Sequence, residues 1–77
     1  MDLSEVGNGK WVKFTRFIGG GGISIKLRSL GIMPGDVAQV KRLAPFGGPI
    51  LIEIDGREIA LGRGIAKRIE VEESSPP

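Results

Sequence analysis

The sequence contains no cysteine, no histidine and no tyrosine among its 77 residues. Without cysteine the chain can form neither a disulfide nor a thiolate zinc site, and it has no thiol nucleophile. Without histidine it lacks the commonest general base and the commonest transition-metal ligand. The hydroxyls of Ser24 and Ser29 therefore have no imidazole to activate them. These absences argue against an enzyme, and no cofactor is expected.

Long apolar runs and a strong charge excess are also missing. No run approaches the roughly 20 residues that cross a bilayer. The N-terminal segment carries acidic residues where a signal peptide would carry basic ones. We therefore expect a cytoplasmic protein that meets a membrane only through a partner. Eleven basic and nine acidic residues give a net charge of +2, an excess too small to direct the chain onto nucleic acid.

The first predicted element is a strand over residues 10–17, a segment rich in aromatic and β-branched residues. Simple alternation places Val12 and Phe14 on one face of this strand and Trp11 and Phe17 on the other. Both faces thus carry apolar groups, as expected in a small barrel whose outer face is partly covered.

Four consecutive glycines follow and predict a flexible break before a short helix. The apolar residues Ile23, Leu27 and Leu30 recur at helical spacing, and Gly31 suits a left-handed C-terminal cap. The stripe predicts that Leu27 and Leu30 cover the open end of a barrel. If either leucine proves exposed, it becomes a candidate for contact with a partner.

The second half of the chain predicts strands over 37–43, 50–54, 57–61 and 69–72. The dipeptide Asp55-Gly56 predicts a type I′ hairpin that sets 52 opposite 59 and 50 opposite 61. The fold class is therefore all-β with one short inserted helix: a small, partly open antiparallel barrel of about five strands. Residues 1–72 form the single domain, and residues 73–77 form a disordered tail.

Two segments carry a resemblance to a known family. The stretch "LRSLGIMPG" at 27–35 and the loop "APFGGP" at 44–49 together resemble the FeoA family, ferrous iron transport protein A. The resemblance implies an SH3-like barrel and a soluble, non-enzymatic accessory protein of a ferrous iron importer. It also implies a partner, the FeoB-type membrane permease with its cytoplasmic GTP-binding domain. A similar domain is appended to iron-dependent repressors, but this chain lacks their helix-turn-helix.

The loop at 45–49 has two interpretations. It is either a bend that joins two strands, with glycines supplying positive φ, or a rigid display of Phe46 as an aromatic anchor. We hypothesise that this loop and the helix face that carries Lys26 and Arg28 form one docking surface. The candidate partner-binding residues are Lys26, Leu27, Arg28, Leu30, Pro45, Phe46, Gly47, Gly48 and Pro49.

Other classes of function remain open as alternatives. Glu53 and Glu58 face each other in the predicted hairpin, and they are weak candidates for an adventitious divalent metal, although no physiological metal site is expected. An SH3-like module could bind a proline-rich peptide, but one Trp and three Phe are few for such a groove. Nucleic acid is disfavoured because the basic residues are interleaved with acidic ones. An open strand edge would allow weak homo-oligomerisation.

Overall fold

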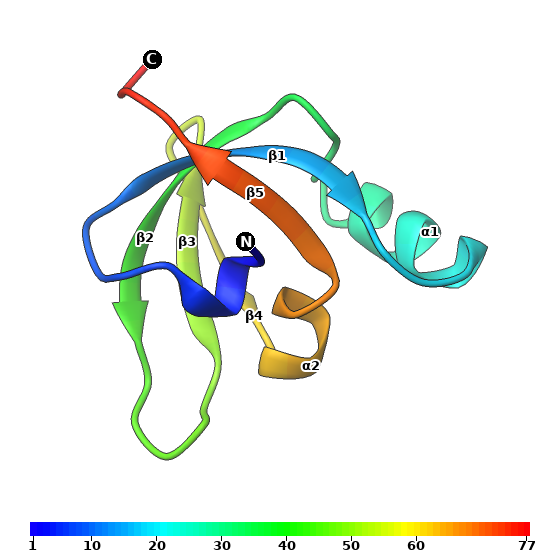
Figure 1. Cartoon of the computed structure of the whole chain (residues 1–77), viewed down its shortest axis with the longest axis horizontal. Helices are drawn as coiled ribbons and strands as arrows, with labels where there is room; N and C mark the ends of the chain where they lie inside the picture. Colours follow the sequence, from blue (N-terminus) through cyan, green and yellow to red (C-terminus); the bar gives the residue numbers. More distant parts are fainter.

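The computed structural model describes all residues, 1–77. The elements in chain order are η1 (Leu3–Glu5), β1 (Trp11–Phe17), α1 (Gly21–Ser29), β2 (Val37–Leu43), β3 (Ile50–Ile54), β4 (Arg57–Leu61), α2 (Arg63–Ala66) and β5 (Ile69–Glu73). The strands form one antiparallel sheet in the order β4-β3-β2-β1-β5, which curls into a partly open barrel (Figure 1). The expected SH3-like architecture is confirmed. None of its helices has the length and apolar character needed to span a membrane.

The β3–β4 hairpin forms as its turn dipeptide predicts. Asp55 and Gly56 have φ values of 50° and 81°, which are the two positive angles of a type I′ turn. The predicted register is confirmed, since Ile52 pairs with Ile59 and Ile50 pairs with Leu61. A one-residue slip would carry these apolar side chains to the solvent face, so the pattern fixes the register.

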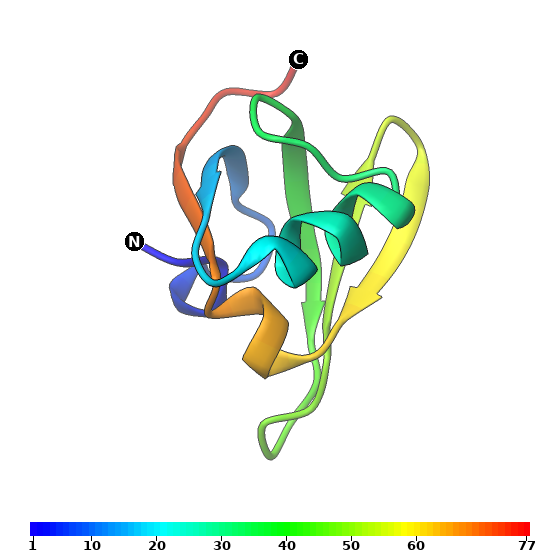
Figure 2. The ribbon, with the colours of Figure 1, turned by 90° about the vertical axis from the view of Figure 1, so that its right-hand side faces the viewer.

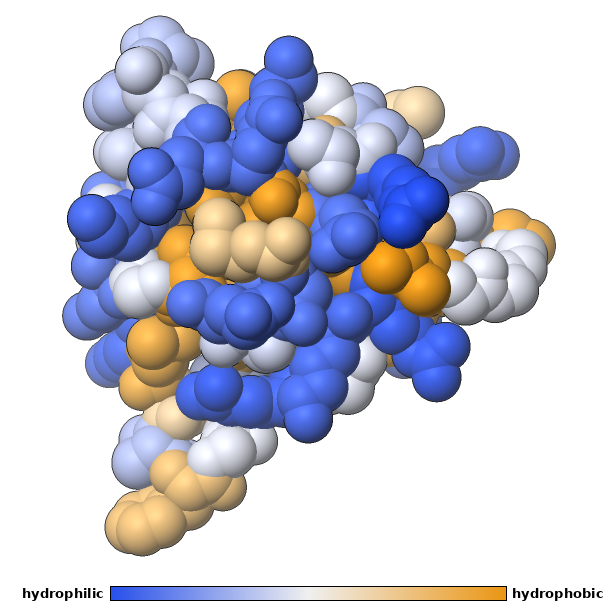
Figure 3. Space-filling view, viewed as in Figure 1, coloured by the Kyte–Doolittle hydropathy of each residue, from blue (hydrophilic) through white to orange (hydrophobic).

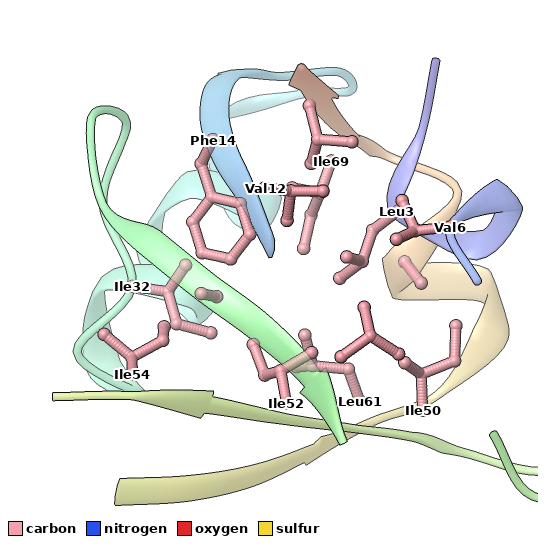
Figure 4. Close-up of a cluster of buried hydrophobic side chains, with 14 of the residues drawn as sticks. Leu3, Val6, Val12, Phe14, Ile32, Ile50, Ile52, Ile54, Leu61 and Ile69 are labelled. Carbon is pink, nitrogen blue, oxygen red and sulfur yellow. The ribbon is translucent and has the colours of Figure 1, made fainter. Parts of the chain in front are cut away.

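The barrel encloses a wholly apolar core, with no buried polar or charged residue. Figure 4 shows Phe14 and Val12 of β1 facing the isoleucines of β3 across the interior. The buried residues are Leu3, Val6, Val12, Phe14, Leu27, Ile32, Ala38, Val40, Ile50, Ile52, Ile54, Leu61, Ala66, Ile69 and Val71. Every strand contributes to this set, so the sheet is held closed by side chains from all of its members.

One detail of β1 differs from the prediction. The register with β5 shifts between Phe14 and Arg16, so Thr15 is the extra residue of a β-bulge. Beyond the bulge, Phe17 lies opposite the buried Ile69 and packs against the core. The prediction that Phe17 shares a face with Trp11 is therefore wrong, because the bulge reverses the alternation of side chains.

Helix α1 begins at Gly21, two residues before the predicted start, so part of the glycine run is helical. Its C-terminal end forms a Schellman motif around Gly31, whose φ is 80°. The Gly31 N–H donates to the Arg28 carbonyl and the Ile32 N–H donates to the Leu27 carbonyl, each at 2.9 Å. Leu27 and Ile32 are both fully buried, so the cap also packs the helix onto the barrel.

The N-terminal segment is an ordered part of the fold that the sequence patterns did not predict. Asp2 and Glu5 form a capping box on η1, and Leu3 and Val6 are buried in the core. The Val71 N–H donates to the Met1 carbonyl at 2.8 Å, so the segment covers the outer edge of β5. The sequence signal for this element was the spacing of Asp2 and Glu5, which is that of a capping box, with Leu3 between them.

The C-terminal boundary also lies further along than predicted. β5 includes Glu73, and the Ser74 N–H donates to the Trp11 carbonyl at 3.0 Å. Backbone pairing with β1 thus continues past the predicted boundary at residue 72.

Candidate functional site

The loop 44–49 between β2 and β3 is a closed turn. The Ala44 N–H donates to the Pro49 carbonyl, and the Gly48 N–H donates to the Pro45 carbonyl, both at 3.1 Å. Phe46 and Gly47 have φ values of 58° and 72°, the signs required by a type I′ turn. The hydrogen bonds across its base and the two prolines, which fix φ at their own positions, restrict the backbone of this loop.

Phe46 is fully exposed at the tip of this loop. The relative exposure of the Phe46 side chain is 104%. The tip of the loop projects from the body of the molecule and is apolar (Figure 3). A non-glycine residue in the left-handed region costs roughly 1–2 kcal/mol. The fold therefore places an aromatic ring in water on a strained backbone position, where neither core packing nor backbone preference favours it.

Arg63 holds the base of the loop from α2. Its Nε donates to the Gly48 carbonyl at 3.0 Å and its Nη2 donates to the Ala44 carbonyl at 3.3 Å. A Cβ on Gly48 would lie 2.8 Å from the Ala44 Cβ, so this close approach requires glycine. No local sequence signal connects residue 63 to the loop, because the contact arises only when β4 returns the chain alongside β3.

The helix candidates differ from one another in accessibility. Lys26 and Arg28 are exposed, and Leu30 is half-buried. Leu27 is fully buried, so its inclusion among the partner-contacting residues is wrong; it belongs to the core, as the apolar stripe of α1 requires. Arg57 donates to the carbonyls of Leu30 and Gly31, each at 3.3 Å, and so satisfies the end of the helix.

The structure does not bring the loop and the helix together into one docking surface. Figures 1 and 2 show loop 44–49 beyond one end of the sheet and α1 well away from it. The reason is the direction of β2, because α1 leads into its start and the loop leaves its end. A seven-residue strand separates its two ends by roughly 20 Å. The predicted residues therefore form two separate patches.

Glu53 and Glu58 lie directly opposite each other, as predicted. Lys41 Nζ approaches Glu53 Oε1 at 3.9 Å, so a neighbouring strand partly compensates the like charges. No group of three or more acidic residues is arranged so that it could hold a metal ion. Two carboxylates alone provide few of the oxygen ligands that a divalent cation requires.

Sequence reasoning did not find a shallow apolar hollow beside the loop. It has a volume of about 170 Å³ and is lined by Arg42, Ala44, Pro49, Leu51 and Ala60. These residues belong to the outer face of β2, β3 and β4 and to the base of the loop. A second hollow of about 120 Å³ lies between α1, the end of β1 and residues 32–34.

Comparison with known proteins identifies similar structures and the family of the chain. The chain resembles a crystal structure of an iron uptake regulatory protein (FeoA) with 36% identity and a TM-score of 0.84 over 95% of each chain. It also resembles the solution structure of iron(II) transport protein A from Clostridium thermocellum, with 34% identity and a TM-score of 0.87 over 95% of this chain and 45% of that one. A crystal structure of ScaR with bound Zn²⁺ shares the fold, with a TM-score of 0.88 at 24% identity over 96% of this chain and 37% of ScaR. No curated protein matches the chain.

The fold is thus that of a small SH3-like domain. The model of the FeoA domain family matches residues 1–73, and the chain belongs to that family. The family and the FeoA crystal structure support a role in ferrous iron transport.

Proposed function

We propose that this FeoA-family protein is a cytoplasmic accessory protein that docks onto a FeoB-type ferrous iron permease through loop 44–49. Phe46 is the anchor of this contact. The observation that carries the proposal is a fully exposed phenylalanine at a φ of 58°. Strained residues that a fold retains without any packing gain cluster at binding sites.

The energetics of the loop favour binding rather than simple chain reversal. Aromatic side chains dominate protein interfaces when they enter an apolar pocket of the partner. Arg63 and the cross-loop hydrogen bonds fix the backbone before contact, so docking orders little beyond the ring itself. A bend without a binding role would place glycine or asparagine at residue 46, where both are less strained.

The second patch on α1 supplies a separate contact. Lys26 and Arg28 are exposed on this helix, and an acidic surface of the partner would complement them. Because the two patches lie apart (Figure 2), a partner that contacts both must span roughly the length of β2. Binding one conformation of the permease better than another would shift its population, and this route requires no catalytic group, cofactor or nucleic acid.

Co-purification with the permease, with and without guanine nucleotide, tests the proposal. Phe46→Ala is expected to reduce the retained protein by at least about tenfold, as for a central aromatic anchor. Ile18→Ala is the matched control, because Ile18 is an exposed large apolar residue outside the loop. Equal retention of Phe46→Ala and native protein would refute the loop as the anchor. Loss of retention only in a Lys26→Glu, Arg28→Glu double variant would instead place the contact on α1.

A further inference from the structure

The outer edge of β4 carries unpaired backbone groups. In a two-residue hairpin the flanking residues form a hydrogen-bonded pair, and such pairs then alternate with non-hydrogen-bonded ones. Counting from Ile54 and Arg57, Glu58 and Ala60 occupy the non-hydrogen-bonded positions. Their N–H and C=O groups therefore point away from β3. No hydrogen bond outside the sheet ladder takes up either residue's backbone groups.

The opposite edge of the same sheet, formed by β5, is paired with the N-terminal segment. On β5, the Val71 N–H donates to the Met1 carbonyl at 2.8 Å, and Asp2 forms a bridge with Glu70. The N-terminal segment thus covers that edge at Glu70 and Val71. Among the strands and helices, only β3 packs closely along β4, so the outward backbone groups of Glu58 and Ala60 can pair with another chain.

An apolar hollow lies directly beside this free edge. Arg42 pairs with Leu51, and Leu51 pairs with Ala60, so these residues form one row across the outer face of the sheet. Ala60 ends the row at the edge and, being small, leaves open the hollow of about 170 Å³ lined also by Ala44 and Pro49. A large apolar side chain opposite Ala60 would lean over it onto Leu51.

The neighbouring row of residues across the outer face is polar and acidic. Gln39 pairs with Glu53, and Glu53 pairs with Glu58 at the edge. Glu58 forms no ion pair, whereas Lys41 approaches Glu53. A positively charged residue is therefore favoured opposite Glu58, because directly opposed unlike charges stabilise a strand pair.

We propose that the β4 edge binds an extended segment of a partner protein, which adds to the sheet as an antiparallel strand. The segment carries a large apolar residue opposite Ala60 and, two residues later in its own direction, a lysine or arginine opposite Glu58. Backbone hydrogen bonds to Glu58 and Ala60 provide the affinity, and the two side-chain positions provide the selectivity. Phe46 is not among the residues that define this site.

A second copy of the chain fits the edge poorly. Three antiparallel registers would match the free groups of one β4 to those of another. Pairing Glu58 with Ala60 of the second copy places a carboxylate over the apolar hollow, and pairing Glu58 with Glu58 opposes like charges. Pairing Ala60 with Ala60 sets Glu58 against Gly62, whose carbonyl already accepts the Ala66 N–H. A segment with an apolar and a basic residue satisfies both rows.

Amide NMR with synthetic peptides tests the proposal. The probe is a short blocked peptide of threonines with one leucine and, two residues later, one lysine. We expect saturable shifts of the Glu58 and Ala60 amides at about 1 mM peptide, the range for one short added strand. The control peptide carries the same residues with lysine before leucine, and it should bind at least about threefold more weakly, because it mismatches both rows.

Two variants of the protein sharpen the test. Ala60→Pro removes an N–H that points to solvent, a position at which an edge strand tolerates proline, and should lower the affinity about tenfold. Glu58→Lys should reverse the preference, so that a leucine–glutamate peptide binds better than the leucine–lysine peptide. This variant keeps the test valid if Ala60→Pro fails to fold.

Three results would overturn the proposal. The first is the absence of shifts at Glu58 and Ala60, and the second is an unchanged peptide preference in Glu58→Lys. The third is a concentration-dependent shift of the same amides without peptide, which would assign the edge to a second copy. Because the peptide assay contains no permease, failure here leaves the Phe46 proposal intact, and failure of the Phe46 variant leaves this one intact.

Discussion

Replacing Phe46 with glycine should stabilise the protein while it removes the proposed anchor. Phe46 sits at a φ of 58°, and glycine adopts positive φ without a steric penalty. The ring is fully exposed, so its deletion removes no packing inside the domain. The substitution therefore separates backbone strain from side-chain contact at a single position.

The size of the effect follows from two opposing terms. Relief of the left-handed strain contributes roughly 1–2 kcal/mol. The greater backbone freedom of glycine in the unfolded chain opposes this by about 0.5–1 kcal/mol. Together the two ranges give a net gain in the free energy of unfolding of about 0–1.5 kcal/mol, with a midpoint of about 0.75 kcal/mol. For a domain of this size the midpoint corresponds to a rise in Tm of about 3–6 °C.

Urea and thermal denaturation followed by circular dichroism measure this change. Phe46→Ala is the matched variant, because alanine keeps the Cβ and hence the strain, and its stability should stay within about 0.5 kcal/mol of native. Phe14→Ala in the core should instead lose about 3–5 kcal/mol. If Phe46→Gly proves less stable than Phe46→Ala, residue 46 does not occupy the left-handed region in solution, and the strain argument for a binding role fails.

Three further predictions concern the loop, the helix and the N-terminus. Arg63→Met removes the donors to Gly48 and Ala44 and should cost about 1–2 kcal/mol, with faster amide exchange in loop 44–49 as the specific readout. Leu27→Ala should cost about 2–5 kcal/mol, because Leu27 is fully buried, whereas Leu30→Ala, at a half-buried site, should cost less in the same urea titrations. Hydrogen bonds from the Ser4 hydroxyl and the Ser4 N–H hold the pKa of Asp2 below its ordinary value of 3.8. The stabilising effect of this carboxylate is therefore present above that value and lost as pH falls through the lowered pKa, so the urea midpoints of native protein and Asp2→Asn should differ at neutral pH and converge in acid.

The parts of the fold that sequence patterns predicted are those set by local chemistry. Asp55-Gly56 specifies its hairpin because both residues accept positive φ. Gly31 ends α1 for the same reason, and the alternating isoleucines of β3 fix which face is buried. Such signals act over a few residues, so they can be read without knowledge of the rest of the chain.

The parts that patterns missed depend on contacts between distant segments. The bulge at Thr15 follows from the pairing of β1 with β5, and the order of the N-terminal segment follows from the burial of Leu3. For the site, the display of Phe46 was one of two interpretations of a loop rich in proline and glycine, and the structure shows Phe46 exposed. The Arg63 contact, the free edge of β4 and the separation of the loop from α1 depend on where the strands run in space.

The loop and the β4 edge are close enough to share one partner. Ala44 and Pro49 at the base of the loop line the same hollow as Ala60 of β4. A segment antiparallel to β4 would enter at this end of the strand, beside the loop. If one partner contacts both, its extended segment leads directly to the pocket that receives Phe46.

A double-mutant cycle tests whether the loop and the β4 edge contact one segment of the partner or make two independent contacts. Phe46→Gly and Ala60→Pro would each be measured for binding to the permease, alone and together. Two independent contacts give additive losses, whereas groups that share one ordered segment of the partner interact by about 0.5–3 kcal/mol. Unchanged permease binding in Ala60→Pro, together with a normal peptide response at β4 in the native protein, would mean that the edge serves a different protein from the loop.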